Sequence, residues 1–193
     1  NTTHYSIIDK DGNVVSNTYT LGYSFGSGVT IPGTGILLDN QMNNFAYQHG
    51  NPEVIDRSAS IGNKFEPGKR PMSTMTPIIV FDTNNELKLI TGSPGGALIP
   101  AAVLRVVTGI IDFNLNLGEA TMLPRLHKDW PYKNLRFEKG FSKDTLKILQ
   151  SYGHELEESK TMGSTQSILI SSKGKEGFAD LRRPNAGVAI QID

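Results

Sequence analysis

A threonine next to the start of this chain of 193 residues can supply both the nucleophile and the general base of an acyl-transfer reaction. If the peptide bond before Thr2 is cleaved, the new α-amine sits on the same residue as the Thr2 hydroxyl and can take its proton. An α-amine has a reference pKa of about 8, so part of it is neutral near pH 7 and no histidine is needed as the base. Because Thr2 leads directly into an expected strand, the opening stretch predicts a nucleophile that is released by chain cleavage.

A glycine-rich turn before an apolar segment could serve the same chemistry. Gly95 and Gly96 end the run Gly92-Ser93-Pro94-Gly95-Gly96, which enters an expected helix at residues 97–111. Backbone N–H groups at a helix start lack partners within the helix, and glycine lets a substrate approach closely. An acyl-transfer enzyme needs such donors for its tetrahedral oxyanion. A plain connection between a strand and a helix is the alternative for this segment alone.

Two further sets of hydroxyl groups are candidates for binding. Ser73 and Thr74 lie between Pro71 and Pro77, which stiffen the backbone, and adjacent hydroxyls can hydrogen-bond a carboxylate. Thr18 and Thr20 alternate in an expected strand, so their side chains share one face. We expect one of these two threonines to lie beside Thr2 across a hairpin.

The elements that must position these residues follow from turn signals and periodicity. We expect strands at residues 4–8, 14–21, 36–38 (short and buried), 76–81, 87–91, 166–171, 177–180 and 188–192. We expect a helix buried on all sides at 97–111, a short helix from 117 to 120, and an amphipathic helix at 142–152 that Ser142 caps and Gly153 ends. Residues 39–70 and 125–136 are expected to be irregular. This order predicts a single α+β domain over residues 1–193 with a largely antiparallel sheet.

The composition excludes several classes of function. Lys and Arg total 19 and Asp and Glu total 19, so the charge favours neither nucleic acid nor an acidic membrane surface. Without cysteine the chain has no disulfide or thiolate site, and its four histidines lack metal-ligand spacing, so we expect no metal and no cofactor. No apolar run reaches the roughly 18 residues that a membrane span needs.

Eight segments, taken together and in order, resemble one family, the small catalytic subunit of γ-glutamyltranspeptidases. They are Thr2-Thr3-His4-Tyr5-Ser6, Asp9-Lys10-Asp11-Gly12-Asn13, Thr18-Tyr19-Thr20, Gly35-Ile36-Leu37-Leu38, Asn40-Gln41-Met42, Lys69-Arg70-Pro71, Gly92-Ser93-Pro94-Gly95-Gly96 and Met162-Gly163-Ser164-Thr165-Gln166-Ser167. The resemblance covers essentially the whole chain.

This resemblance implies an N-terminal-nucleophile fold, which is an αββα sandwich with largely antiparallel sheets. It implies self-cleavage of a precursor before Thr2 and a non-covalent large subunit as partner. The implied enzyme is a γ-glutamyltransferase and glutathione hydrolase. Its Thr2 attacks the γ-amide of glutathione or another γ-glutamyl compound, and the γ-glutamyl group then passes to water, an amino acid or a dipeptide. Bacterial members of the family are mostly periplasmic or secreted.

The resemblance also assigns roles to single residues. Thr2 is the implied nucleophile, and Thr20 is the hydroxyl that supports its α-amine. Gly95 and Gly96 form the oxyanion hole. Ser73 and Thr74 are the adjacent hydroxyls that bind the substrate α-carboxylate. Gln41 and Asn44 occupy the positions that face the substrate α-amino group.

Two departures from the family pattern concern the substrate α-amino group. Asn44 stands where the family usually has an acid, and Gly22 stands where many relatives have an asparagine. Loss of a charge-assisted hydrogen bond costs on the order of 1–3 kcal/mol. An acylase that acts on glutaryl-type amides, as related cephalosporin acylases do, is therefore the alternative function.

A third departure is Asn1, because the implied mature subunit begins at Thr2. It suggests an uncleaved precursor form, a cleavage-deficient variant, or a chain whose upstream part is not included. A non-catalytic, permanently uncleaved relative is the third hypothesis.

Overall fold

The computed structural model describes residues 2–46, 61–129 and 134–191, which fall into two compact units. The first unit comprises Asn1–Thr2 and Tyr19–Thr74, and the second comprises Thr3–Thr18 and Met75–Asp193. Asn1 lies outside the described residues. The prediction of one domain over 1–193 stays a prediction.

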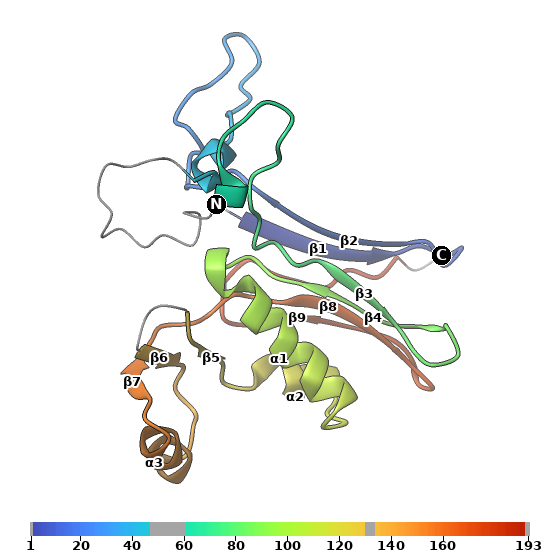
Figure 1. Cartoon of the computed structure of the whole chain (residues 1–193). Helices are drawn as coiled ribbons and strands as arrows, with labels where there is room; N and C mark the ends of the chain where they lie inside the picture. Colours follow the sequence, from blue (N-terminus) through green and yellow to red (C-terminus); the bar gives the residue numbers. More distant parts are fainter. Residues whose placement is uncertain (1, 47–60, 130–133, 192–193) are drawn as a thin grey trace. The chain divides into compact units, whose positions relative to one another are not determined.

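The second unit is built in three layers (Figure 1). Its central antiparallel sheet has the order β3 (Ile78–Phe81), β4 (Leu87–Gly92), β8 (Gln166–Ser171) and β9 (Gly174–Ala179). Helices α1 (Ile99–Ile111) and α2 (Leu117–Met122) pack on one face of this sheet. The hairpin of β1 (Thr2–Ile8) and β2 (Val14–Thr20) lies on the other face.

Polar side chains join the hairpin to the central sheet. The Ser6 hydroxyl donates to the Gln166 carbonyl oxygen at 2.9 Å, and the Ser16 hydroxyl donates to the Thr91 carbonyl oxygen at 3.0 Å. The hairpin residues of the second unit therefore turn a polar face inward.

The apolar core of the second unit lies between the helices and the central sheet. It contains Leu89, Val106, Ile110, Leu117, Ala120 and Leu169. Leu104 is 61% exposed and Ile111 is 48% exposed, so the expectation of a helix buried on all sides is wrong. The helix buries one face, and a single turn of 3₁₀ helix, η4 (Gly96–Leu98), precedes it.

The predicted hairpin turn and the predicted cap at Ser142 are confirmed, and the structure adds a cap that was not predicted, at Asn116. The Asp9 side chain accepts hydrogen bonds from the backbone N–H groups of Asp11 and Asn13, which closes the hairpin turn. Asn116 caps α2 through a reciprocal capping box with Glu119. Ser142 caps α3 (Lys143–Ser151) by accepting from the Thr145 N–H group at 3.1 Å.

A small sheet in the second unit was not predicted. It has the order β5 (Leu126–His127), β6 (Asn134–Phe137) and β7 (Glu155–Glu158), with β6 and β7 parallel. The expectation that residues 125–136 are irregular is therefore wrong at 126–127 and 134–136, and its residues 130–133 lie outside the description. The strands are short and β7 carries three glutamates, so neither propensity nor alternation marks them.

Two expected strands are absent from the described residues. Residues 188–191 form no ladder, although the Val188 side chain lies against Gly177 of β9; Ile192 lies outside the description. In the first unit, residues 36–38 make only an isolated bridge from Leu37 to Thr30. Ile36 is 57% exposed, so this segment is not buried. A paired strand needs neighbouring strands as well as a favourable composition, which a local pattern does not show.

The described residues of the first unit are mostly loop, with two short 3₁₀ helices, η1 (Gln41–Asn44) and η3 (Ile61–Asn63). Phe45 is 3% exposed and packs edge-on against Phe65, with ring centroids 5.2 Å apart. Ala46 pairs with Lys64 through an isolated bridge. These contacts anchor η1, which carries two of the predicted binding residues.

Candidate active site

The hairpin brings two predicted catalytic threonines together. Thr2 begins β1 and Thr20 ends β2, and the Thr2 hydroxyl donates to the Thr20 hydroxyl at 2.8 Å. The Gly22 N–H group donates to the same Thr20 oxygen at 2.9 Å. Of the two threonines expected beside Thr2, the structure therefore selects Thr20. Thr18 contacts His4 instead.

Two predicted binding residues continue this network. Gln41 and Asn44 are three residues apart in η1, and side chains at this spacing eclipse in a 3₁₀ helix. The Gln41 amide donates to the Thr20 carbonyl oxygen at 3.4 Å, and the Asn44 amide donates to the Gln41 side-chain oxygen at 2.5 Å. Thr2, Thr20, Gln41 and Asn44 are thus joined in one chain of contacts.

The paired hydroxyls Ser73 and Thr74 follow a segment that is tied to η1. The Asn63 side chain donates to the Asn44 carbonyl oxygen at 2.7 Å and accepts from the Met72 N–H group at 2.9 Å. Ser73 is exposed and Thr74 is half-buried. Asn63 was not predicted as a site residue, and its isolated position in the sequence gives no signal for this link.

The two predicted oxyanion glycines belong to the second unit and precede α1. Gly95 has a φ of 145° and Gly96 has a φ of 59°, both in the region that favours glycine. A Cβ on Gly95 would lie 3.1 Å from the Gly163 Cα atom. The run 92–96 and the segment around Gly163 are far apart in the sequence, but they pack together in the structure.

His4 is a buried, neutral residue. The residue is 5% exposed, and burial lowers the pKa of His4 from 6.5 to about 4. Since the Ser6 hydroxyl donates to a carbonyl, it must accept from the His4 Nε2 atom at 3.1 Å. His4 Nδ1 then accepts from the Thr18 hydroxyl at 2.7 Å. This network fixes the tautomer and leaves His4 no role as the base.

A buried ionic cluster in the second unit was missed. The Arg125 guanidinium contacts the Asp180 carboxylate at 2.7 Å, and Arg182 contacts Glu138 at 2.9 Å. Burial lowers the pKa of Arg125. Burial raises the pKa of Asp180, but the charges and hydrogen bonds of Arg125 and Arg182 together outweigh it and keep the pKa of that carboxyl below its usual value. The residues are far apart in sequence, so no local pattern could have revealed them.

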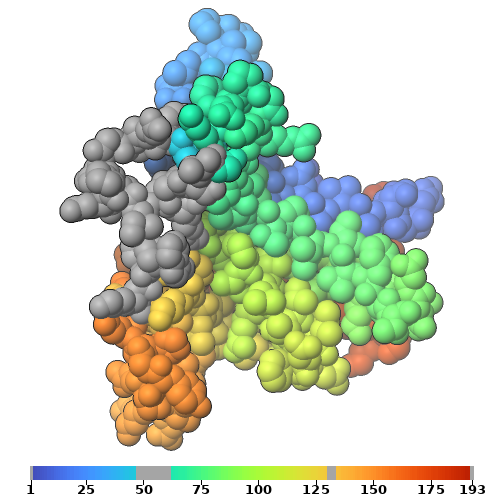
Figure 2. Space-filling view, in the orientation of Figure 1, coloured from blue at the N-terminus to red at the C-terminus, as the bar shows by residue number. Residues whose placement is uncertain are grey.

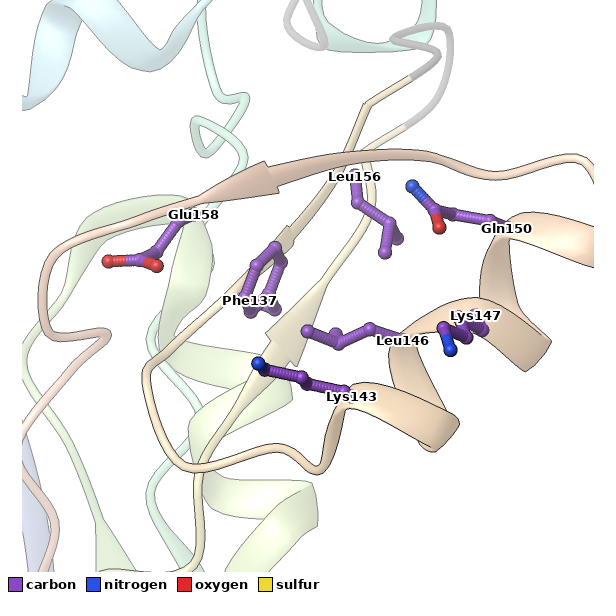
Figure 3. Close-up of a pocket in the computed structure, with 7 residues that line it drawn as sticks. All are labelled: Phe137, Lys143, Leu146, Lys147, Gln150, Leu156 and Glu158. Carbon is purple, nitrogen blue, oxygen red and sulfur yellow. The ribbon is translucent and has the colours of Figure 1, made fainter.

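A pocket of about 400 Å³ lies elsewhere, between α3 and the strands β6 and β7. Phe137, Leu146 and Leu156 give it an apolar wall (Figure 3). This region forms the orange part of the surface in Figure 2. None of the predicted site residues lines the pocket.

Known proteins resemble this chain in both sequence and fold. The glutathione hydrolase proenzyme of Escherichia coli K12 is 47% identical over 174 residues, which are 90% of this chain and 30% of that protein. A crystal structure of a mutant γ-glutamyltranspeptidase from Helicobacter pylori matches with a TM-score of 0.85 and 40% identity, over 94% of this chain and all of that one. The cephalosporin acylase from Bacillus halodurans has a TM-score of 0.83 and 28% identity, over 98% of this chain and 34% of that one.

The fold is therefore that of N-terminal-nucleophile hydrolases, which confirms the predicted α+β class. A model of the γ-glutamyltranspeptidase family matches residues 1–190, and the chain belongs to this family of enzymes. The chain spans about a third of the length of the curated relatives it matches. Among residues 2–46, 61–129 and 134–191, no helix is long and apolar enough to cross a membrane.

Proposed function

We propose that this chain is the catalytic small subunit of a γ-glutamyltransferase and glutathione hydrolase. The observation that carries the proposal is the hydrogen bond between Thr2 and Thr20 at the open end of the hairpin. It gives the expected nucleophile a fixed hydroxyl partner, in a chain whose relatives are named glutathione hydrolase proenzymes.

The proposed reaction begins once the bond between Asn1 and Thr2 is cleaved. The free α-amine of Thr2 takes the proton of the Thr2 hydroxyl, whose oxygen attacks the γ-carbonyl carbon of the substrate. Backbone N–H groups of Gly95 and Gly96, in the role that the family resemblance gives them, stabilise the oxyanion. Collapse of the intermediate breaks the C–N bond. The Thr2 ammonium returns its proton to the departing amine, and a γ-glutamyl ester remains on Thr2. Water or the α-amine of an amino acid or dipeptide then attacks the ester and restores Thr2.

Substrate recognition is proposed to use the amide side chains of Gln41 and Asn44 and the paired hydroxyls of Ser73 and Thr74. Ser73 and Thr74 bind the α-carboxylate, and Gln41 and Asn44 face the α-amino group. Because the Asn44 amide nitrogen already donates to Gln41, its side-chain oxygen is the atom that remains to accept from a substrate ammonium.

A large subunit from the same precursor is the proposed partner. The outward face of the hairpin carries Tyr5, Ile7 and Val15, which are 39%, 50% and 45% exposed, whereas its inward face is polar. A sheet with one face in water usually turns its polar residues outward, and this hairpin turns apolar residues outward instead. An exposed apolar surface of this kind marks an interface. A further layer packed over this face would complete an αββα sandwich. From the family resemblance we place the protein in the periplasm or outside the cell, which fractionation of the native host tests.

A neutral Asn44 favours one second candidate, an acylase for glutaryl-type amides. The uncharged Asn44 amide cannot form a charge-assisted hydrogen bond to a substrate ammonium. When the substrate has no ammonium, an amide is cheaper to bury against it than an unpaired carboxylate. The fold similarity to a cephalosporin acylase fits this candidate too.

The test is kcat/KM for a γ-glutamyl anilide against the matching glutaryl anilide, on the protein co-expressed as both subunits. The two substrates differ only in the α-amino group. A strong preference for γ-glutamyl supports the proposed function. Parity or a preference for glutaryl overturns it in favour of the acylase.

A further inference from the structure

The fully buried hydroxyl of Ser93 connects two loops of the second unit. Ser93 is 0% exposed. Its oxygen accepts from the Ser164 N–H group at 2.9 Å, and its hydrogen is donated to the Pro94 carbonyl oxygen at 2.6 Å. The hydroxyl therefore has both a fixed donor and a fixed acceptor, and it cannot rotate without breaking one of these bonds.

The Pro94 carbonyl belongs to the same peptide unit as the Gly95 N–H group. In a planar trans peptide the carbonyl and the N–H group point in opposite directions. A bond that holds the Pro94 oxygen toward Ser93 thus turns the Gly95 N–H group the other way. Gly95 itself has a φ of 145°, so its own backbone preference does not fix this orientation.

We propose that Ser93 is a positioning residue that aims the Gly95 N–H group at the oxyanion. This inference rests on the proposed function, because it needs the oxyanion role of Gly95. Ser93 does not touch the substrate. It acts only through the orientation of the peptide between Pro94 and Gly95.

The segment at residues 162–165, which contains the Ser164 N–H group, is held by hydrogen bonds at both ends. The Met162 carbonyl oxygen accepts from Arg125 at 2.5 Å, and the Thr165 N–H group donates to Asp180 at 3.0 Å. A Cβ on Gly163 would lie 2.7 Å from the Ser93 oxygen and 2.9 Å from the Ala102 Cβ atom. This segment is bonded to the buried charged groups of Arg125 and Asp180, and there is no space for a side chain at Gly163. The Ser164 N–H group therefore has a fixed position as the donor to the Ser93 hydroxyl.

The test compares Ser93→Ala with Ser167→Ala in the co-expressed two-subunit protein. Ser167 is also buried, at 4% exposure, and its hydroxyl bonds Thr91 at 2.7 Å between β4 and β8. Both variants delete one buried hydroxyl, so both should lower the unfolding temperature. Loss of one oxyanion donor costs about 100- to 1,000-fold in kcat, so a misaimed donor should cost about 10- to 100-fold. We expect this loss in Ser93→Ala with KM nearly unchanged, and a kcat close to wild type in Ser167→Ala.

Equal kcat losses in the two variants would overturn the proposal, as would a Ser93→Ala effect confined to KM. If Ser93→Ala yields no cleaved chain, Ser93→Cys is measured instead, since a thiol keeps a weak donor in place. An intermediate kcat with unchanged KM supports the proposal, and a kcat equal to that of Ser167→Ala contradicts it. A wild-type protein without γ-glutamyl turnover refutes the proposed function itself, which is a separate result.

Discussion

The hydroxyl groups of Thr2 and Thr20 are 2.8 Å apart, and Thr2 is the donor. The first residue of β1 and the last residue of β2 are thereby locked together at the open end of the hairpin. A second donor, the Gly22 N–H group, holds the Thr20 oxygen in place. The side chain of the proposed nucleophile thus has a defined orientation before any substrate binds.

Replacement of the Thr20 hydroxyl tests the value of this orientation. Thr20→Val keeps the shape and removes the hydroxyl, so kcat should fall by about 10- to 100-fold, the loss of one or two strong hydrogen bonds. Thr20→Ser keeps the hydroxyl and should retain most of the wild-type kcat. Steady-state kinetics on a γ-glutamyl anilide check both variants, and equal activity of the two would show that the hydroxyl is not used.

The contact between Asn44 and Gln41 gives a prediction about specificity. In Asn44→Asp a carboxylate replaces the amide that donates to Gln41, so Gln41 must rotate to present its nitrogen and give up the Thr20 carbonyl. The new charge should favour an ammonium by about 1–3 kcal/mol, or about 5- to 150-fold in the ratio of γ-glutamyl to glutaryl turnover.

The matched control for this change is Asn43→Asp, which adds the same charge at the exposed neighbouring position. Its ratio should stay near that of the wild type. If both variants shift the ratio of kcat/KM values equally, Asn44 does not face the α-amino group.

The burial of His4 predicts a loss of stability in acid. The pKa of His4 is lowered to about 4 in the folded protein, so between pH 6.5 and pH 4 the unfolded chain binds the proton and the folded chain does not. Stability should therefore fall as the pH drops through this window, by up to about 3 kcal/mol. Urea unfolding at pH 7 and pH 4.5 measures the loss. His4→Gln should lose clearly less than the wild type, and an equal loss would mean that other groups cause it.

Local signals in the sequence were enough for much of the fold. The hairpin turn at Asp11 and Gly12 and the cap at Ser142 rest on contacts between near neighbours in the chain. The pairs β3–β4 and β8–β9 also join strands that follow each other in sequence, whereas the pairing of β4 with β8 does not. The period of two in a strand predicted that Thr18 or Thr20 lies beside Thr2, and the structure selects Thr20.

Features that depend on distant residues could not be predicted in this way. The buried pair of Arg125 and Asp180 joins positions on either side of α3, and β7 pairs in parallel with β6 across that same helix. Ser93 looked like part of a glycine turn, and only the structure shows its bond with Ser164. The roles of the predicted site residues stay predictions until they are measured.

The most direct test of the account is the mass of the chain during turnover. The co-expressed protein is mixed with a γ-glutamyl substrate, quenched in acid and analysed by intact-mass and peptide mass spectrometry. We predict a chain that begins at Thr2 and carries one γ-glutamyl group on that residue, and a Thr2→Ala variant that stays uncleaved and inactive. Turnover without modification of Thr2, or activity retained in Thr2→Ala, would contradict the assignment of Thr2 as the nucleophile.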